Sequence, residues 1–309
     1  MSSREYMIVV DRAIKVYESR GEKITALREV SLRVPKRSVY TIMGPSGSGK
    51  TTLLNLIGGI DKPTAGTIIV DNINVSSLTG EDLRKYRLHK IGYVFQSYNL
   101  VPTLTALENV LLPMTLAGRP DRERALDLLR QVGLEGLEKR FPEELSGGQQ
   151  QRLAIAVALA NDPPVIIADE PTGELDLATG ERIVRLLLDQ RDRHGKTVLI
   201  TTHDPRVARM TDKVILLEDG RILGEYEPSK IHDIAGGTAT GEVSAERVIV
   251  EYIKKRLAEL GEEMRRLADA FARGEVDPDT FEEKYRELKT LQKAFQAELS
   301  RLGAGPEAL

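Results

Sequence analysis

The chain has 309 residues, no cysteine, and a net charge of −3 from 44 basic and 47 acidic residues. This length exceeds that of one small domain, the near balance of charge gives no strong attraction to nucleic acid, and the missing thiols exclude disulfides and thiolate metal sites. The N-terminus lacks the apolar core of a signal peptide, and no run of about 18 apolar residues occurs. We therefore expect a chain that does not cross a membrane by itself.

Short apolar segments at residues 7–10, 14–17 and 30–34 predict a β-rich edge near the N-terminus. Further β-branched runs at 40–43, 165–168, 197–201 and 213–217 alternate with helical patterns. These later runs are continuously apolar, which is typical of parallel strands that are covered on both faces. Apolar residues recur at helical spacing within about 98–160 and predict a helical insert. The pattern predicts an α/β fold with a mostly parallel sheet.

A change in composition near the C-terminus indicates a second, smaller part. Residues 234–241 are mostly small, so we expect the main domain at 1–232 and a linker at 233–243. Two apolar stripes with steps of three and four follow, from Val250 to Phe271 and from Phe281 to Leu302. Between them, Gly274 is placed near a helix end and Asp277 is a candidate N-cap. Residues 244–309 are therefore predicted to form an antiparallel helical hairpin.

A glycine-rich loop follows the first buried strand and precedes a helical segment, which is the context that a phosphate-binding loop requires. Backbone amides of the loop would surround the β-phosphate, Lys50 would neutralise β- and γ-oxygens, and the Thr51 hydroxyl would hold Mg²⁺. The expected ligand is a nucleoside triphosphate. The candidate ATP-binding residues of this segment are Gly44, Ser46, Gly47, Ser48, Gly49, Lys50, Thr51 and Thr52.

Polar residues follow three further strand segments, and ligands of open α/β sheets gather at the carboxyl ends of strands. Asp169 suits Mg²⁺ and Glu170 suits an attacking water, although acids at a strand end can also be ordinary loop residues. The Gln96 amide is placed to contact both Mg²⁺ and that water. His203 is placed to reach the γ-phosphate as a neutral donor, where the alternative is a packing or capping role. The candidate catalytic residues are thus Lys50, Gln96, Glu170 and His203.

A second glycine-rich motif spans residues 145–152, with the sequence LSGGQQQR. Its glycines leave backbone N–H groups uncovered beside the Ser146 hydroxyl. The apolar run from Leu153 to Ala160 predicts a helix, whose positive N-terminal end would face an anion. A flexible polar turn is the alternative for the motif alone. In the context of the phosphate loop, it is interpreted as a second phosphate contact.

These motifs and their order resemble the ATP-binding subunits of ABC transporters, over roughly residues 5–228. Segments 91–110 and 168–173 are similar to the lipoprotein-releasing and macrolide-exporter branch of that family, which also contains ATPases that drive conformational signalling across membranes. Glu174 departs from the branch, where Asn is common. The resemblance implies a P-loop NTPase cassette with a mostly parallel sheet, an antiparallel β edge and a helical subdomain.

The resemblance also implies a head-to-tail dimer that forms around two ATP molecules. Tyr17 lies where the family has an aromatic ring that stacks on adenine, although an ordinary strand tyrosine is the alternative. Residues 98–110 would receive a helix of an integral membrane permease, or else only pack the helical subdomain. The chain would then be cytoplasmic and peripheral at the inner face of the membrane. Residues expected to contact ATP or the seam from the partner copy are Ser146, Gly147, Gly148, Gln149 and Asp176.

Three other classes share parts of this pattern. DNA-maintenance ATPases of the SMC-like group insert their coil between the two glycine-rich motifs, whereas the coil here is terminal. Translation-factor relatives carry two cassettes, and only one phosphate loop is present. A nucleotide-gated regulator without turnover disagrees with the joint presence of Gln96, Glu170 and His203. For the hairpin, the open hypotheses are dimer contact, permease docking, restraint of closure, or packing for stability.

Overall fold

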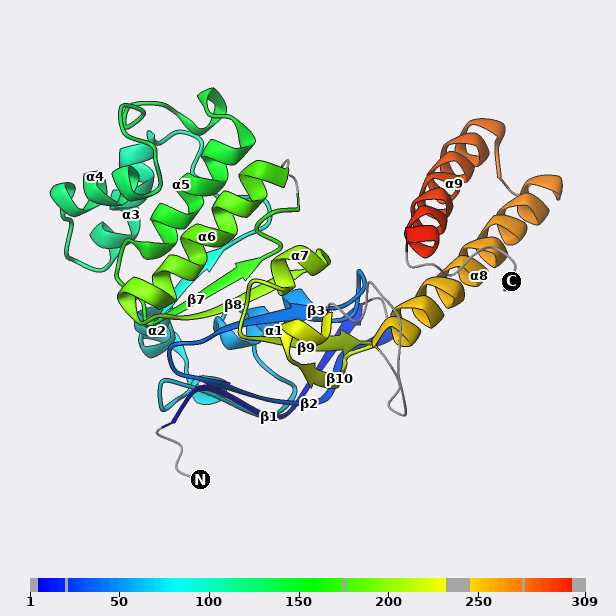
Figure 1. Cartoon of the computed structure of the whole chain (residues 1–309), viewed down its shortest axis with the longest axis horizontal. Helices are drawn as coiled ribbons and strands as arrows, with labels where there is room; N and C mark the ends of the chain where they lie inside the picture. Colours follow the sequence, from blue (N-terminus) through cyan, green and yellow to red (C-terminus); the bar gives the residue numbers. More distant parts are fainter. Residues whose placement is uncertain are drawn as a thin grey trace. The chain divides into compact units, whose positions relative to one another are not determined.

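The computed structural model describes residues 5–19, 22–173, 175, 177–231, 245–273 and 276–301 (Figure 1). The chain divides into two compact units, residues 1–228 and 229–309, and each is described by itself. The linker predicted at residues 233–243 lies outside the described residues, as do Glu174 and Asp176.

The first unit is built on a six-stranded sheet. Five neighbouring strands are parallel, and the sixth, at one edge, pairs antiparallel with its neighbour. Its strands are, in spatial order, β10 (Arg221–Tyr226), β9 (Lys213–Glu218), β3 (Val39–Met43), β8 (Thr197–Thr202), β7 (Val165–Asp169) and β6 (Ile91–Val94). The predicted α/β fold with a mostly parallel core is confirmed.

Successive residues of the central strands enter two different hydrophobic clusters. In β7, Val165 and Ile167 belong to the cluster on one face of the sheet, and Ile166 and Ala168 belong to the cluster on the other. Side chains of a strand alternate between faces, so a strand that is buried on both faces must be apolar at every position. This explains the continuous apolar runs in the sequence.

The predicted N-terminal β edge is a separate antiparallel sheet rather than a border of the parallel one. Its order is β2 (Glu22–Pro35), β1 (Tyr6–Ser19), β4 (Ala65–Val70) and β5 (Ile73–Asn74). Strand β1 is continuous, and its register shifts in pairing with β2 allow a long, bent strand. Helix α1 (Lys50–Ile57) lies between the two sheets, because its apolar residues join the cluster that contains side chains of both (Figure 1).

The opposite face of the parallel sheet carries α6 (Leu177–His194) and the predicted helical subdomain (Figure 1). The subdomain contains α3 (Ala106–Leu116), α4 (Arg122–Gln131) and α5 (Gly147–Leu159), which contact one another. Its helices bury their apolar faces in the same cluster as β7 and β8. The remaining elements of this unit are α2 (Gly80–Lys90), α7 (Pro205–Ala208) and the short 3₁₀ helices η1 (Val75–Ser77) and η2 (Pro142–Glu144).

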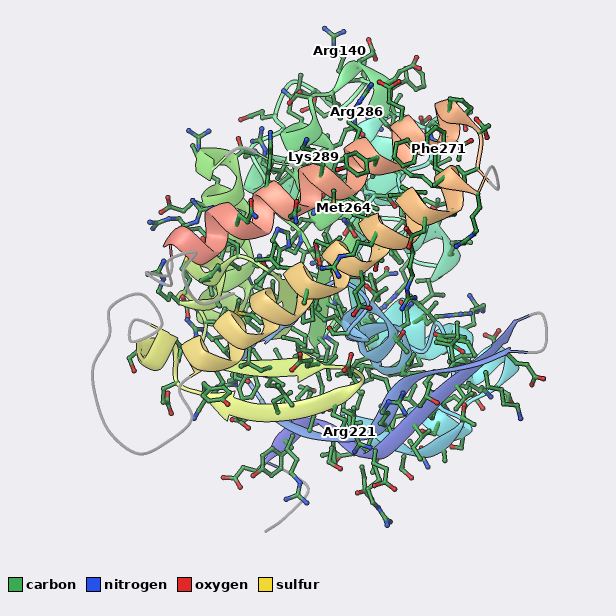
Figure 2. All side chains as sticks on the ribbon, turned by 90° about the vertical axis from the view of Figure 1, so that its right-hand side faces the viewer. Arg140, Arg221, Met264, Phe271, Arg286 and Lys289 are labelled. Carbon is green, nitrogen blue, oxygen red and sulfur yellow. The ribbon has the colours of Figure 1, made fainter. Side chains whose placement is uncertain are left out.

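The second unit is the predicted helical hairpin, preceded by η3 (Pro228–Ile231). Helices α8 (Ala245–Ala272) and α9 (Pro278–Arg301) run antiparallel and pack side by side (Figures 1 and 2). The predicted N-cap is confirmed, since the Thr280 amide donates to Asp277 Oδ1 at 3.0 Å. The rings of Phe271 and Phe281 stack at 4.4 Å across the turn, which joins the two apolar stripes.

Candidate functional site

The carboxyl ends of four neighbouring strands lie side by side at one end of the parallel sheet, which we call the sheet edge below. The register aligns Met43 with Thr202, Thr201 with Asp169, and Ala168 with Val94. The residues that follow these strands are therefore neighbours: the phosphate loop after β3, His203 after β8, Glu170 after β7 and Gln96 just beyond β6. Strand pairing alone brings together residues that are far apart in sequence.

The phosphate loop takes a backbone path that requires glycine. Gly47 and Gly49 have φ angles of 78° and 103°, in the left-handed region that disfavours side chains. A Cβ at Gly44 would lie 2.0 Å from the Leu217 carbonyl oxygen, so neighbouring backbone also excludes a side chain there. The buried Ser48 hydroxyl has no hydrogen-bond partner in the structure. The loop thus leaves a polar backbone surface at the N-terminus of α1.

Lys50 is buried at the start of α1 and its ammonium group reaches back over the loop. Its Nζ donates to the carbonyl oxygens of Gly44 and Pro45, both at 2.9 Å. Glu170 Oε1 lies 3.7 Å from the same nitrogen. Only 6% of Lys50 is exposed, so its charge is held close to where a phosphate would enter the loop.

The two carboxylates at the end of β7, on Asp169 and the following Glu170, are held in different ways. Asp169 is buried, and its Oδ1 accepts a hydrogen bond of 2.6 Å from the Thr201 hydroxyl. Glu170 has a φ of 44°, a conformation that costs a non-glycine residue about 1–3 kcal/mol. Its amide donates to Thr201 Oγ1 at 2.9 Å, which holds the turn in place. Thr201 therefore supports both acids, a role that the sequence interpretation missed.

His203 faces Glu170, with 3.3 Å between Nδ1 and Oε2. The hydrogen bond to Glu170 outweighs desolvation and raises the pKa of His203, and the same bond lowers the pKa of Glu170. Contact with Glu170 therefore stabilises the protonated form of His203 relative to an isolated histidine, and the neutral donor expected from the sequence stays a prediction. Glu170 therefore lies between the Lys50 ammonium group and the His203 imidazole ring.

We expect His203→Gln to destabilise the nucleotide-free protein more at pH 6 than at pH 9. A raised folded-state pKa stabilises the fold below the unfolded value of about 6.5, and this contribution disappears as the pH rises through the folded pKa. Urea midpoints at both pH values measure the effect. In a Glu170→Gln background, His203→Gln should cause the same loss of stability at both pH values. An equal loss of stability at both pH values would contradict a charged pair.

Tyr17 on β1 lies beside the helix that follows the phosphate loop. Its hydroxyl donates to Asp61 Oδ2 at 2.9 Å, and the Thr52 side chain also hydrogen-bonds the phenol. The residue is 39% exposed, so an aromatic surface remains accessible near Thr52. The position is compatible with adenine stacking. Gln96 is exposed in the turn after β6, at the same sheet edge as Glu170.

The second glycine-rich motif forms the start of α5. The Ser146 amide donates to Gln149 Oε1 at 2.8 Å, so the Gln149 side chain shapes the turn. A Cβ at Gly148 would lie 2.6 Å from Thr179 Cγ2, so a larger residue there would require the Thr179 side chain to shift. A cavity of about 310 Å³ opens at this helix end. It is lined by Ser146, Gly147, Gly148, Arg152, Leu175, Thr179 and Arg182.

This cavity favours an anion, because its lining includes two arginines and no carboxylate. The two arginines lie close enough for the charge of Arg182 to disfavour the charged form of Arg152, whose pKa is lowered first by burial. None of its lining residues belongs to the phosphate loop. The sequence interpretation missed both arginines, although Arg152 closes the motif itself. The expected seam residue Asp176 lies outside the described residues.

Within the described residues, no helix is long and apolar enough to span a bilayer. The loop between β3 and α1, the carboxylates at the end of β7 and the separate glycine-rich helix start together define a P-loop nucleotide-binding cassette. Residues 27–173 match the family described as ABC transporter.

Relatives identify the family more fully. The chain is 49% identical over 226 residues to an uncharacterised ABC transporter ATP-binding protein, MJ0796, of Methanocaldococcus jannaschii, covering 70% of this chain and 95% of that protein. It is 44% identical over 203 residues to the lipoprotein-releasing system ATP-binding protein LolD of Bacteroides fragilis, covering 65% and 94% respectively. The chain belongs to the ATP-binding subunits of ABC transporters, and the resemblance to the lipoprotein-releasing branch is confirmed.

The fold has a matching solved structure. A dimeric, post-hydrolysis state of the MJ0796 cassette bound to ADP and Pi superimposes with a TM-score of 0.69 at 47% identity, covering 72% of this chain and 99% of that one. The likeness supports the transporter subunit over the DNA-maintenance alternative, and it supports nucleotide binding and ATPase activity.

Proposed function

We propose that this chain is a Mg²⁺-dependent ATPase subunit that dimerises around two ATP molecules and thereby drives a separate membrane permease. The observation that carries the proposal is the division of phosphate-binding groups between two places. Lys50 and Glu170 lie together at the sheet edge, whereas the cavity at Ser146 to Gly148 is lined by other residues. Two half-sites on one molecule make two complete sites when two copies associate head to tail.

Each half-site has a defined task in this proposal. Lys50 leaves the carbonyls of Gly44 and Pro45 and binds β- and γ-phosphate oxygens. Glu170 accepts the proton of the attacking water, and His203 donates to the γ-phosphate. From the partner copy, Ser146 and the backbone amides of the two following glycines stabilise the charge that develops on that phosphate. Hydrolysis removes the bridging phosphate, and the two copies separate.

The residues present fit Mg²⁺. Asp169 keeps Oδ2 for a metal while Oδ1 is bound by Thr201, and Thr51 is an exposed residue at the start of α1. Gln96 adds an amide oxygen at the same edge. Mg²⁺ prefers such oxygen donors and completes its shell with water and substrate phosphates, which suits this small protein donor set. When bound, the ion neutralises charge on the phosphate oxygens.

We also propose that an integral membrane permease docks on the cassette near residues 98–110, which would place the chain at the inner face of the membrane. The support is the kinship with LolD, which its name assigns to a lipoprotein-releasing system. Purifying the tagged chain from solubilised membranes tests this partner. A copurifying multi-span protein is expected, and its absence in the presence of bound nucleotide would contradict the proposal.

We expect phosphate release to require both ATP and Mg²⁺. We also expect Lys50→Ala to lower kcat/KM by about 10²–10³-fold, because it removes a charge aimed at the transferred phosphate. Steady-state phosphate release, with and without EDTA, measures both effects. Lys85→Ala, an exposed lysine on α2, is the matched control and should behave as the parent. Equal rates for the Lys50 and Lys85 variants would contradict the assignment.

A further inference from the structure

Asp61 connects two side chains of strand β1 beside the nucleotide site. Its Oδ1 accepts from Lys15 Nζ at 2.7 Å and its Oδ2 accepts from the Tyr17 hydroxyl at 2.9 Å. Lys15 Nζ also donates to the Lys62 carbonyl oxygen at 2.8 Å. One carboxylate therefore ties a cation and an aromatic ring to the segment that follows α1.

These contacts fix the plane and the free face of the Tyr17 ring. The Lys15 ammonium lies over the ring, 4.8 Å from its centroid, and so occupies one face. The Lys15 side chain is only 12% exposed and is held there by its ion pair with Asp61. An adenine base can then stack only on the face that Lys15 leaves open. Without Asp61, both the hydroxyl and the ammonium would lose this anchor.

We propose that Asp61 is a positioning residue for adenine recognition, which holds the Tyr17 ring and the Lys15 ammonium in the arrangement that receives the base. This inference rests on the proposed role of Tyr17 as the platform for adenine. Asp61 touches neither the phosphates nor the attacking water in this account. It acts through the ring. Because Asp61 already orders the Tyr17 and Lys15 side chains, less conformational entropy is lost when the nucleotide binds.

The electrostatics of Asp61 agree with this geometry. Burial alone would raise the pKa of Asp61, but hydrogen bonds from Lys15, the Lys62 amide and Tyr17 lower it below its usual range. The carboxylate is therefore ionised at neutral pH and accepts all three bonds. Burial, followed by the hydrogen bond to Asp61, raises the pKa of Tyr17, which keeps the phenol protonated as the donor.

The test compares ADP, which carries the base, with pyrophosphate, which does not. Calorimetric dissociation constants are measured with Mg²⁺ for the parent, Asp61→Ala, Asp61→Asn, Tyr17→Ala and the Asp61→Ala/Tyr17→Ala double variant. Neither ligand supports hydrolysis, so binding is measured alone. Affinity for pyrophosphate also reports whether the phosphate loop remains folded in each variant. Lys85→Ala serves as the surface control.

We expect Tyr17→Ala to weaken ADP binding by about 5- to 150-fold, as for loss of a base–ring stack, and Asp61→Ala to weaken it by about 3- to 10-fold, as for loss of a hydrogen bond. Pyrophosphate binding should stay within about twofold. The double variant should bind ADP no more weakly than Tyr17→Ala. Asp61→Asn, which retains an acceptor for the phenol, should keep more affinity than Asp61→Ala. For ATP hydrolysis, Asp61→Ala should raise KM and leave kcat unchanged.

Two results would overturn the proposal in distinguishable ways. If Tyr17→Ala leaves ADP affinity unchanged, the ring is not the adenine platform and the underlying role of Tyr17 fails. Suppose instead that Tyr17→Ala weakens ADP binding. If Asp61→Ala then leaves ADP binding unchanged, or weakens ADP binding and pyrophosphate binding equally, the role of Tyr17 stands and the positioning role of Asp61 is wrong. An additive loss in the double variant would likewise show that Asp61 acts independently of the ring.

Discussion

Glu170→Gln is expected to lose most ATP hydrolysis and to accumulate as an ATP-bound dimer. The amide has the shape of the carboxylate but cannot accept the proton of the attacking water, and general-base catalysis contributes about 10²–10⁴-fold to a rate. Glu170 lies 3.7 Å from Lys50 Nζ and 3.3 Å from His203 Nδ1, so the group that is changed sits among the residues that we propose to bind the γ-phosphate. Removing its negative charge also removes repulsion of the phosphate.

Two measurements on the same sample test this expectation: phosphate release, and molar mass by light scattering with and without ATP. Glu123→Gln, an exposed carboxylate on α4, is the matched control and should retain the parent rate. Equal turnover by Glu170→Gln and the parent would contradict its role as the base. Lost turnover without a stable dimer would show that closure depends on the Glu170 carboxylate itself.

Ser146→Arg is expected to prevent ATP-driven dimerisation and leave nucleotide binding largely intact. Ser146 lines the cavity at the start of α5, together with Gly147 and Gly148, and a long side chain there would fill the space that we propose to receive the phosphate held by the partner. The phosphate loop lies on other elements of the same molecule and keeps its contacts. In the Glu170→Gln background, the added substitution should convert the ATP-bound dimer to a monomer.

ADP affinity and molar mass in ATP measure the two halves of this expectation. Arg182 lines the same cavity, and Arg182→Ala removes one positive charge without adding bulk. A loss of dimerisation in this variant would therefore be electrostatic, whereas the loss in Ser146→Arg includes steric blocking of the cavity. A dimer of normal stability in the Ser146→Arg variant would show that the second glycine-rich motif has been misinterpreted.

The features predicted well from sequence are those with local causes. The phosphate loop depends on glycines within one turn, and the hairpin depends on a repeat carried by each helix. Both patterns are complete within a short segment, so the sequence displays them directly. The alternation of apolar strands and helical patterns likewise predicted the parallel sheet, because burial on both faces leaves a continuous apolar run.

The features that escaped prediction depend on pairing between distant segments. Thr201 supports Asp169 across 32 residues, and Asp61 holds Tyr17 across 44. Nothing local marks either partner, since a threonine on a strand and an aspartate after a helix are ordinary residues. The positive φ of Glu170 is also set by its neighbours, through the bonds from its amide to Thr201. The N-terminal strands form their own sheet and share a hydrophobic cluster with α1 and the parallel sheet, an arrangement that no single strand reveals.

The central claim is that each ATP site is completed by a second copy, and a cross-link between two marked copies tests it most directly. The natural chain has no cysteine, so Ser46→Cys and Ser146→Cys each introduce a unique thiol. Both variants, made in the Glu170→Gln background with tags of different size, are mixed and treated with a short bifunctional maleimide. We predict a cross-link between the two variants that requires ATP, and little between copies of the same variant. Cross-links between identical variants, or equal yields without ATP, would contradict the head-to-tail arrangement.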